Sequence, residues 1–164
     1  MATPSTHPFN CSRCANHNVS EFAIYEPTDN WLIVYPKIRL IHAHLGIATW
    51  DDRSSTEEAA WIQATLEKIY TQHSPTTFLI FVDLTRSDDS EFPSRKALKI
   101  YAEIFKHTQT ASMVLYGVST AMQGIIQIVL HLSGAHKKVQ VVKNIHQADT
   151  CFREWSKKNK TRAV

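Results

Sequence analysis

The chain has 164 residues, of which 43% are hydrophobic and 20% are charged, a balance typical of one globular domain with a full core. Its net charge of +3 is mild and much of the excess falls near the end, so we expect no nucleic-acid partner. No apolar run approaches the roughly 20 residues that span a bilayer, and residues 1–8 lack the features of a secretory signal. Three cysteines argue against a disulfide framework, so we expect a cytoplasmic protein.

Residues 1–18 show no hydrophobic period, which predicts a flexible N-terminal arm before a domain over 19–158 and a basic tail over 159–164. The arm carries four side chains that zinc can bind, His7, Cys11, Cys14 and His17. Cys-x2-Cys is a zinc-knuckle spacing, but natural zinc ribbons take their second ligand pair from a distant hairpin. The pattern therefore favours an arm without a cofactor, and a zinc-linked sensor is the alternative.

Three short strands are predicted at the start of the domain, over 22–25, 31–35 and 38–45, as an antiparallel meander. In the third strand, His42 and His44 alternate with Ile41 and Ala43 and therefore lie on the opposite face. Two histidines at this spacing can bind a metal. More often such histidines coat the face of a sheet, and this is the interpretation that we prefer.

Helices and strands alternate through the rest of the chain. Continuous apolar runs predict buried strands over 78–83, 112–118 and 139–142. Amphipathic patterns predict helices before and after them, with capping pairs at Ser54–Glu57, Ser55–Glu58, Thr120–Gln123 and Asn144–Gln147. The order β-β-β-α-β-α-β-α-β-α predicts an α/β fold, a mixed sheet with a short N-terminal β-meander and helices packed on the sheet.

Three stretches make residues 21–155 resemble the STAS superfamily, and within it the SpoIIAA-like group. The buried strand ends in Asp83-Leu84-Thr85, which is similar to the family's Asp-Leu-Ser or Asp-Leu-Thr. Residues 93–97 look like the start of the family's regulatory helix, and residues 139–155 are similar to its closing strand and helix. The family's Asp-Ser-Ser-Gly phosphorylation motif is absent, and Asp88-Asp89-Ser90-Glu91 stands in its place. The resemblance implies a STAS/SpoIIAA-like fold and a non-enzymatic regulatory module, as in anti-sigma-factor antagonists.

The loop after the central strand supplies the candidates for partner binding or a phospho-switch, which are Asp83, Thr85, Ser87, Ser90, Phe92, Ser94 and Arg95. The carboxylate of Asp83 is expected to shape the loop rather than to catalyse a reaction. If Ser94 is a helix N-cap, a phosphate there would meet free backbone N–H groups and the positive end of the helix dipole. Phe92 is a candidate anchor. The partner would be a kinase or an anti-sigma-like regulator, and a homodimer is a further expectation.

Other functional classes fit the sequence less well. No nucleophile elbow, Gly-rich phosphate loop or His-x-x-x-His helix appears, so no enzyme is predicted. A receiver domain does not begin with antiparallel strands. Some SpoIIAA-like domains are grouped with lipid-binding CRAL-TRIO proteins, so the resemblance allows an apolar ligand pocket. Its lining would come from Met122, Ile125, Ile126, Val129, Leu130, Trp61 and Tyr101. A simple helix–sheet core is the preferred interpretation of these residues.

Overall fold

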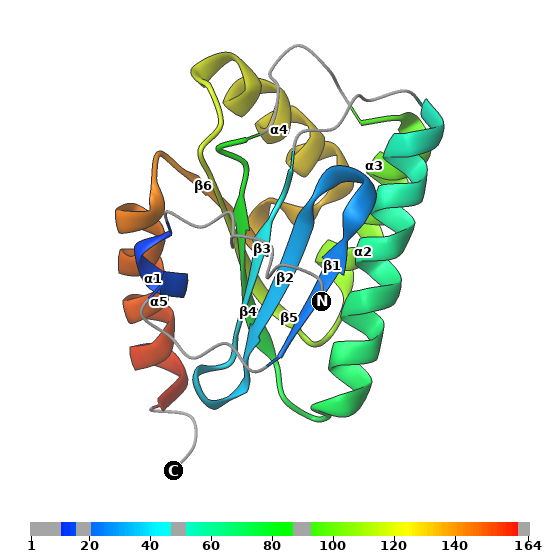
Figure 1. Cartoon of the computed structure of the whole chain (residues 1–164). Helices are drawn as coiled ribbons and strands as arrows, with labels where there is room; N and C mark the ends of the chain where they lie inside the picture. The colour runs from blue at the N-terminus through cyan, green and yellow to red at the C-terminus, as the bar shows by residue number, and fades with distance from the viewer. Residues whose placement is uncertain (1–10, 16–20, 47–51, 87–92, 161–164) are drawn as a thin grey trace.

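The computed structural model of the chain describes residues 11–15, 21–46, 52–86 and 93–160. It is an α/β fold on a six-stranded mixed sheet whose strands lie in chain order (Figure 1). An antiparallel meander opens the sheet, formed by β1 (Phe22–Tyr25), β2 (Asn30–Tyr35) and β3 (Leu40–His44). Parallel strands continue it from β3 through β4 (Phe78–Asp83), β5 (Thr110–Tyr116) and β6 (Val139–Val142). The predicted α/β class and order of elements are confirmed.

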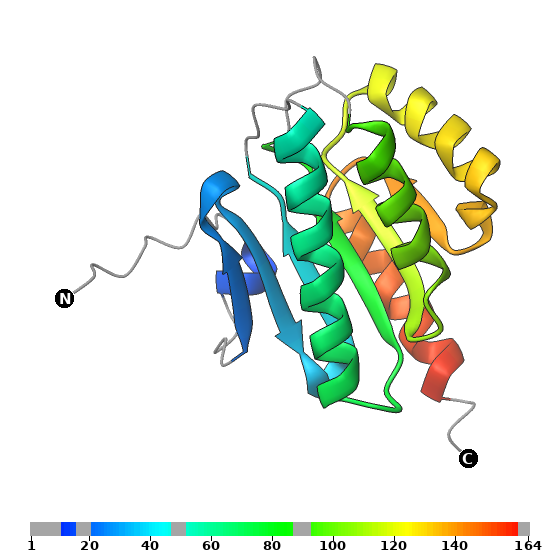
Figure 2. The same cartoon turned by 90° about the vertical axis from the view of Figure 1, so that its right-hand side faces the viewer.

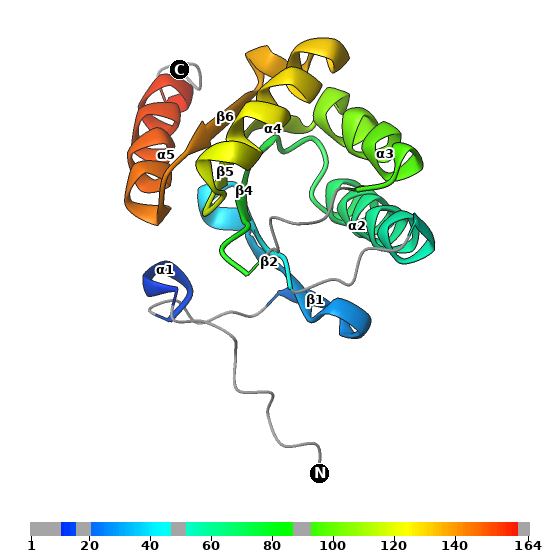
Figure 3. The ribbon, with the colours of Figure 1, turned by 90° about the horizontal axis from the view of Figure 1, so that it is seen from above.

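Three helices share one face of the sheet. α2 (Asp52–Gln72), α3 (Arg95–Lys106) and α4 (Thr120–Ser133) each join two neighbouring parallel strands (Figure 2). Successive crossovers step in the same direction along the sheet, and such crossovers are right-handed, so all three helices fall on the same face. α5 (Ile145–Lys160) follows the edge strand β6 and lies on the other face, together with the short α1 (Ser12–Ala15), as Figure 3 shows.

Side-chain alternation along the strands creates one hydrophobic core on each face. The larger core joins the inner residues of α2, α3 and α4, such as Leu66 and Leu130, to strand residues that include Ile41 and Ile80. The smaller core lies under α5 and α1 and includes Phe81 and other strand residues. Ile126, Leu130, Trp61 and Tyr101, which were considered for a ligand pocket, all belong to or pack against the larger core. For these four residues the helix–sheet core is the correct interpretation.

The helix ends agree with the sequence only in part. α2 begins at Asp52, so Ser55 lies inside the helix, where its hydroxyl accepts a hydrogen bond from the Ser94 amide. The N-cap of α4 is Ser119 rather than Thr120, because the Ser119 side chain accepts from the Met122 amide. At the start of α5 the predicted cap is confirmed. There Asn144 Oδ1 accepts from the Gln147 amide, and Gln147 Oε1 accepts from the Lys143 amide.

Part of the N-terminal segment is packed against the sheet. Residues 12–15 form α1, in which the Cys14 side chain is buried. Arg13 pairs with Asp149 of α5, and its guanidinium lies 5.6 Å from the Phe81 ring centroid and 4.9 Å from that of Phe152. Residues 11–15 are therefore not the flexible arm that their polar sequence predicts, because they form a helical turn that buries Cys14 and contacts α5.

α4 contains no Asp, Glu, Lys or Arg and leaves Ile128 and Leu132 exposed to solvent. Even so, within the described ranges no helix combines the length and the apolar character that a bilayer crossing requires.

Two glycines give opposite predictions for stability. A Cβ on Gly46 would lie 1.5 Å from the carbonyl oxygen of Thr28, whereas a Cβ on Gly124 in α4 would meet nothing within 4 Å. We expect Gly46→Ala to lower the free energy of unfolding by about 1–3 kcal/mol or more, because the backbone must move apart. Gly124→Ala should raise it by about 0.5–1 kcal/mol through helix propensity. Urea unfolding of both variants measures this, and a stable Gly46→Ala protein would contradict the close approach.

Candidate metal centre

Two buried histidines of β3 face the smaller core. His42 and His44 share the face of Leu40, opposite Ile41 and Ala43, as the alternation predicts. They do not merely coat this face, because their exposed fractions are 0% and 3%. Their ring centroids are 4.0 Å apart. Buried imidazoles need polar partners, and they find them in α1 and in the neighbouring strands.

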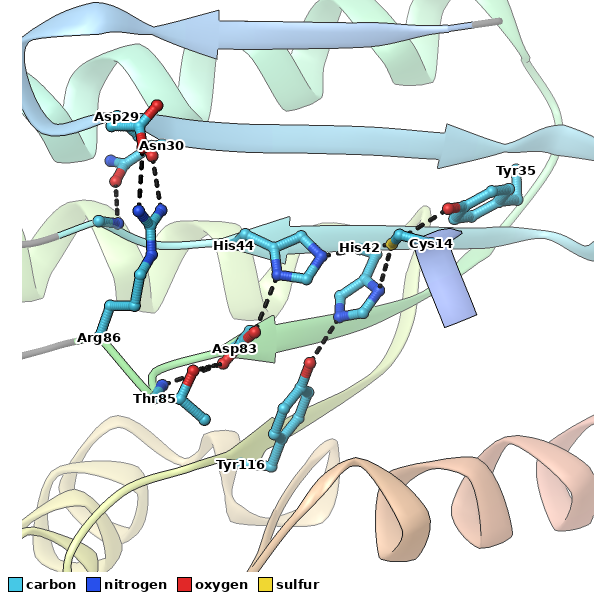
Figure 4. A network of polar contacts seen from close by, with 11 residues as sticks. Cys14, Asp29, Asn30, Tyr35, His42, His44, Asp83, Thr85, Arg86 and Tyr116 are labelled. Atoms are coloured by element: carbon cyan, nitrogen blue, oxygen red, sulfur yellow. Dashed lines mark hydrogen bonds and ion pairs between the residues drawn. The ribbon is translucent and has the colours of Figure 1, made fainter. Parts of the chain in front are cut away.

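Four ligand-type atoms meet where α1 covers β3. Cys14 Sγ lies 3.3 Å from His42 Nδ1 and 3.4 Å from His44 Nε2 (Figure 4). With the thiol of Cys11, all four atoms lie within 4.8 Å of one another. A tetrahedral zinc ion with bonds of about 2.0–2.3 Å separates its ligand atoms by about 3.3–3.8 Å. The two sulfur–nitrogen distances therefore fit the edges of such a tetrahedron.

Outer hydrogen bonds orient each of the three fully buried side chains. His44 Nδ1 lies 2.8 Å from Asp83 Oδ2, and His42 Nε2 lies 2.7 Å from Tyr116 Oη. The hydroxyl of Tyr35 donates to Cys14 Sγ over 3.2 Å. Each histidine thus has one ring nitrogen held by an outer partner and the other directed at the cysteine. Metal-bound histidines in proteins are held in this way, often by a carboxylate.

The electrostatics of the cluster favour the metal-binding form of His42 and Cys11, and the protonated form of His44 and Cys14. Burial lowers the pKa of His42, which favours the neutral imidazole that binds metal. Burial alone would lower the pKa of His44 too, but hydrogen bonds with Asp83 and Cys11 raise it overall. The pKa of Asp83 is lowered, because hydrogen bonds from His44 and Thr85 outweigh its burial. A hydrogen bond from Cys14 lowers the pKa of Cys11 and raises that of Cys14, so the pair readily holds one thiolate.

The donor set selects the kind of metal and the kind of site. Two thiolates and two imidazoles in tetrahedral reach favour zinc over hard cations such as magnesium or calcium. Four protein ligands leave no open position for a substrate or an activated water, which is the arrangement of structural rather than catalytic zinc sites. Chemically, this cluster is suited to hold α1 on the sheet.

The predicted zinc ligands contain half of this set, Cys11 and Cys14. The structure brings these two together with His42 and His44, a pair for which metal binding was the less preferred interpretation, and His7 and His17 lie outside the described residues. The pairing was missed because the two pairs are far apart in the chain. A signal for it was present, since Cys-x2-Cys calls for a second pair from a distant hairpin, and β2 and β3 form that hairpin.

The rim at the end of β4 holds the other predicted site residues that can be described. Asp83 Oδ1 accepts from the amide and the hydroxyl of Thr85, so the expected role in shaping the loop is confirmed. Ser94 is the N-cap of α3, as predicted, and accepts from the Ala97 amide. Its hydroxyl is also 2.9 Å from that of Thr56, and it is nearly buried. Arg95 is exposed as the first residue of α3. Ser87, Ser90 and Phe92 lie outside the described residues.

A second polar cluster lies beside this rim and was not expected. Glu58 of α2 is buried, and its Oε1 accepts from Thr28 Oγ1 over 3.0 Å and from Asn30 Nδ2. Asn30 Oδ1 in turn accepts from the Gly46 amide over 2.6 Å. Among the described residues, no hydrogen-bond partner is found for the buried Glu58 Oε2 or for the buried hydroxyl of Tyr101. Burial raises the pKa of Glu58 above 4.5 despite the two donors.

No protein-family model matches this sequence, and no curated protein is significantly similar to it. The resemblance to the STAS superfamily therefore stays a prediction.

Glu58 predicts a pH dependence of stability. A carboxyl whose folded pKa is raised binds more protons in the folded state, so its contribution to stability is lost as pH rises from 4.5 through the folded value. Glu58→Gln keeps the acceptor for Thr28 and Asn30 and cannot ionise. We expect the variant to be more stable than the wild type at pH 8, with a difference that shrinks toward pH 4.5 in urea unfolding. An equal or growing difference toward acid would contradict the buried ionisation.

Proposed function

We propose that this chain is a zinc-binding regulatory domain without catalytic activity, in which the metal fastens the N-terminal segment to the sheet. The observation that carries the proposal is the convergence of Cys11, Cys14, His42 and His44 within 4.8 Å, from two segments far apart in the chain. The outer partners Asp83, Tyr116 and Tyr35 support it, because they orient three of the four ligands in the way that outer partners orient metal-bound side chains.

The four-ligand, largely buried arrangement favours a structural role for the metal, and with it a non-enzymatic function. The wider role that we propose is partner binding at the rim after β4, whose described residues are 83–86 and 93–95, as the resemblance to STAS domains implies. Thr85 and Arg95 are exposed there, and the Arg86 guanidinium is partly exposed beside Asp29. A kinase or an anti-sigma-like regulator remains the proposed class of partner.

The metal content of the protein tests the first part of the proposal. Freshly purified wild type should carry about one zinc ion per chain by elemental analysis, and Cys14→Ser should lose it. Cys151→Ser is the matched control, because Cys151 lies on α5 outside the cluster. At zinc concentrations about 1,000 times the Kd, the metal adds about 4 kcal/mol of stability. A chelator should then lower Tm by about 8–16 °C in the wild type.

Two results would contradict this assignment. One is wild-type protein that lacks zinc and takes up none when zinc is supplied. The other is a Cys14→Ser protein that binds zinc as tightly as the Cys151→Ser control.

Partner binding is tested at the rim. Phe92→Ala should reduce recovery of the native partner by about tenfold in quantitative affinity purification, as for an interface residue that contributes about 1–2 kcal/mol. Ser94→Asp should reduce recovery through the charge that it adds beneath the rim, because Ser94 itself is nearly buried. Ser94→Asp keeps the helix start, since Asp is also a good N-cap. Equal recovery with both variants and with the wild type would count against the rim as the binding edge.

A further inference from the structure

A continuous set of hydrogen bonds joins the metal cluster to the rim. His44 directs Nε2 at Cys14 and Nδ1 at Asp83 Oδ2, at 3.4 and 2.8 Å. The other oxygen of the same carboxylate, Asp83 Oδ1, accepts from the Thr85 amide at 3.0 Å and from its hydroxyl at 2.7 Å. Thr85 is exposed, so these contacts span the distance from a buried ligand to the surface (Figure 4).

Contacts around Thr85 extend to the neighbouring loops. Arg86, the next residue, donates from Nη1 to Asp29 Oδ2 at 2.9 Å and from Nη2 to the Asp29 carbonyl at 2.8 Å. Gly117, just after β5, packs so closely on Thr85 that an added Cβ would lie 2.5 Å from the Thr85 methyl group. Residues 85 and 86 therefore contact two other loops. Arg86 binds the turn before β2, and Thr85 packs on the loop after β5.

A metal ion would affect these hydrogen bonds by fixing which ring nitrogen of His44 carries the hydrogen. A neutral imidazole carries its hydrogen on either ring nitrogen. Coordination through Nε2 leaves Nδ1 as the only position for it, so the hydrogen bond to Asp83 Oδ2 becomes obligatory and the ring is fixed. With one oxygen held by His44, the carboxylate presents the other to Thr85 in a single orientation.

We propose that metal occupancy of the Cys11–Cys14–His42–His44 centre sets the conformation of the rim residues Asp83 to Arg86, through His44 and Asp83, and so regulates binding at this edge. The inference rests on the proposed zinc site and assigns its regulatory output. Asp83 acts here as a positioning residue that carries no chemistry of its own. Because coupling between two sites is reciprocal, a partner that holds Thr85 in place would also tighten metal binding.

The test compares amide exchange by NMR in the zinc-loaded and the zinc-free full chain, with zinc content measured in the same samples. In the wild type, zinc should slow exchange of the Thr85 amide by about tenfold, because its acceptor is then held in place. The amide of Gln147 is the internal control. It is also bonded to a side-chain oxygen at an exposed site, that of Asn144. Its helix is tied to α1 by the Arg13–Asp149 pair and not by the His44–Asp83 path, so its exchange should change less than that of Thr85.

Two variants separate the path from a general effect of the metal. Asp83→Ala keeps all four ligands and removes the link, so zinc should still bind but should leave the Thr85 amide unchanged. Tyr35→Phe removes the outer partner of Cys14 and keeps the bonds of Asp83 to His44 and Thr85. In this matched control, zinc should still slow exchange at Thr85. If Asp83→Ala fails to fold, the wild-type comparison of Thr85 with Gln147 decides the question.

The outcomes distinguish the two levels of the proposal. Bound zinc with unchanged Thr85 exchange in the wild type would overturn the inference and leave the zinc site intact. Equal slowing at Thr85 and Gln147 would overturn it as well, since the metal would then act on the whole fold. A wild-type chain that binds no zinc would overturn the proposed function, and the inference with it.

Discussion

The alternation of side chains along β3 is the constraint on which the rest of the centre depends. Residues 40, 42 and 44 must share one face because successive side chains of a strand point to opposite sides, and this face is the one that α1 and α5 cover. The sheet register then sets the outer partners. His44 lies opposite Asp83 on β4, and Asp83 lies opposite Tyr116 on β5. One row across three strands thus carries three residues of the centre. His44 is a ligand, Asp83 bonds to His44, and the hydroxyl of Tyr116 bonds to the second histidine, His42. A slip of one residue in either pairing would move this row to the other face.

The fold was largely predictable, because local patterns determine it. The apolar runs from Phe78 and from Met113 could only be buried strands, and their alternation with amphipathic helices requires parallel neighbours. The errors were local. The start of α2 was misplaced because Ser54 and Ser55 mimic a helix cap, whereas Ser55 serves Ser94 of a different helix. The hydrogen bond between Ser55 and Ser94 depends on which helices are neighbours in the fold. The spacing of residues within one helix does not predict that.

The metal centre was harder to predict, for a physical reason. Cys-x2-Cys and His-x-His are each short and common motifs, and neither indicates which other residues complete a metal site. The two pairs meet because residues 11–15 pack against β3 of the meander. The polar N-terminal segment has no hydrophobic period that would predict this packing. The burial of Glu58 was not predicted for a similar reason. An acidic residue on a helix is usually exposed, and the sequence does not show that Asn30 and Thr28 lie beside this one. Sites assembled from separate segments become visible only with the topology.

The geometry also explains why a metal would be needed at this position. α5 packs on β4 and β5, so it leaves the β2–β3 part of the same face to be covered by α1. A helix of four residues buries too little apolar surface to offset the conformational entropy of fixing its own chain, about 1–2 kcal/mol per residue. Its other attachment, Arg13 against Asp149 and two aromatic rings, is partly exposed and contributes little. In the proposed site, four metal–ligand bonds would supply what hydrophobic burial cannot, and they would do so beside the carboxylate that holds Thr85. The sparse cover of this part of the sheet thus lies next to the rim, where loss of the proposed metal would act.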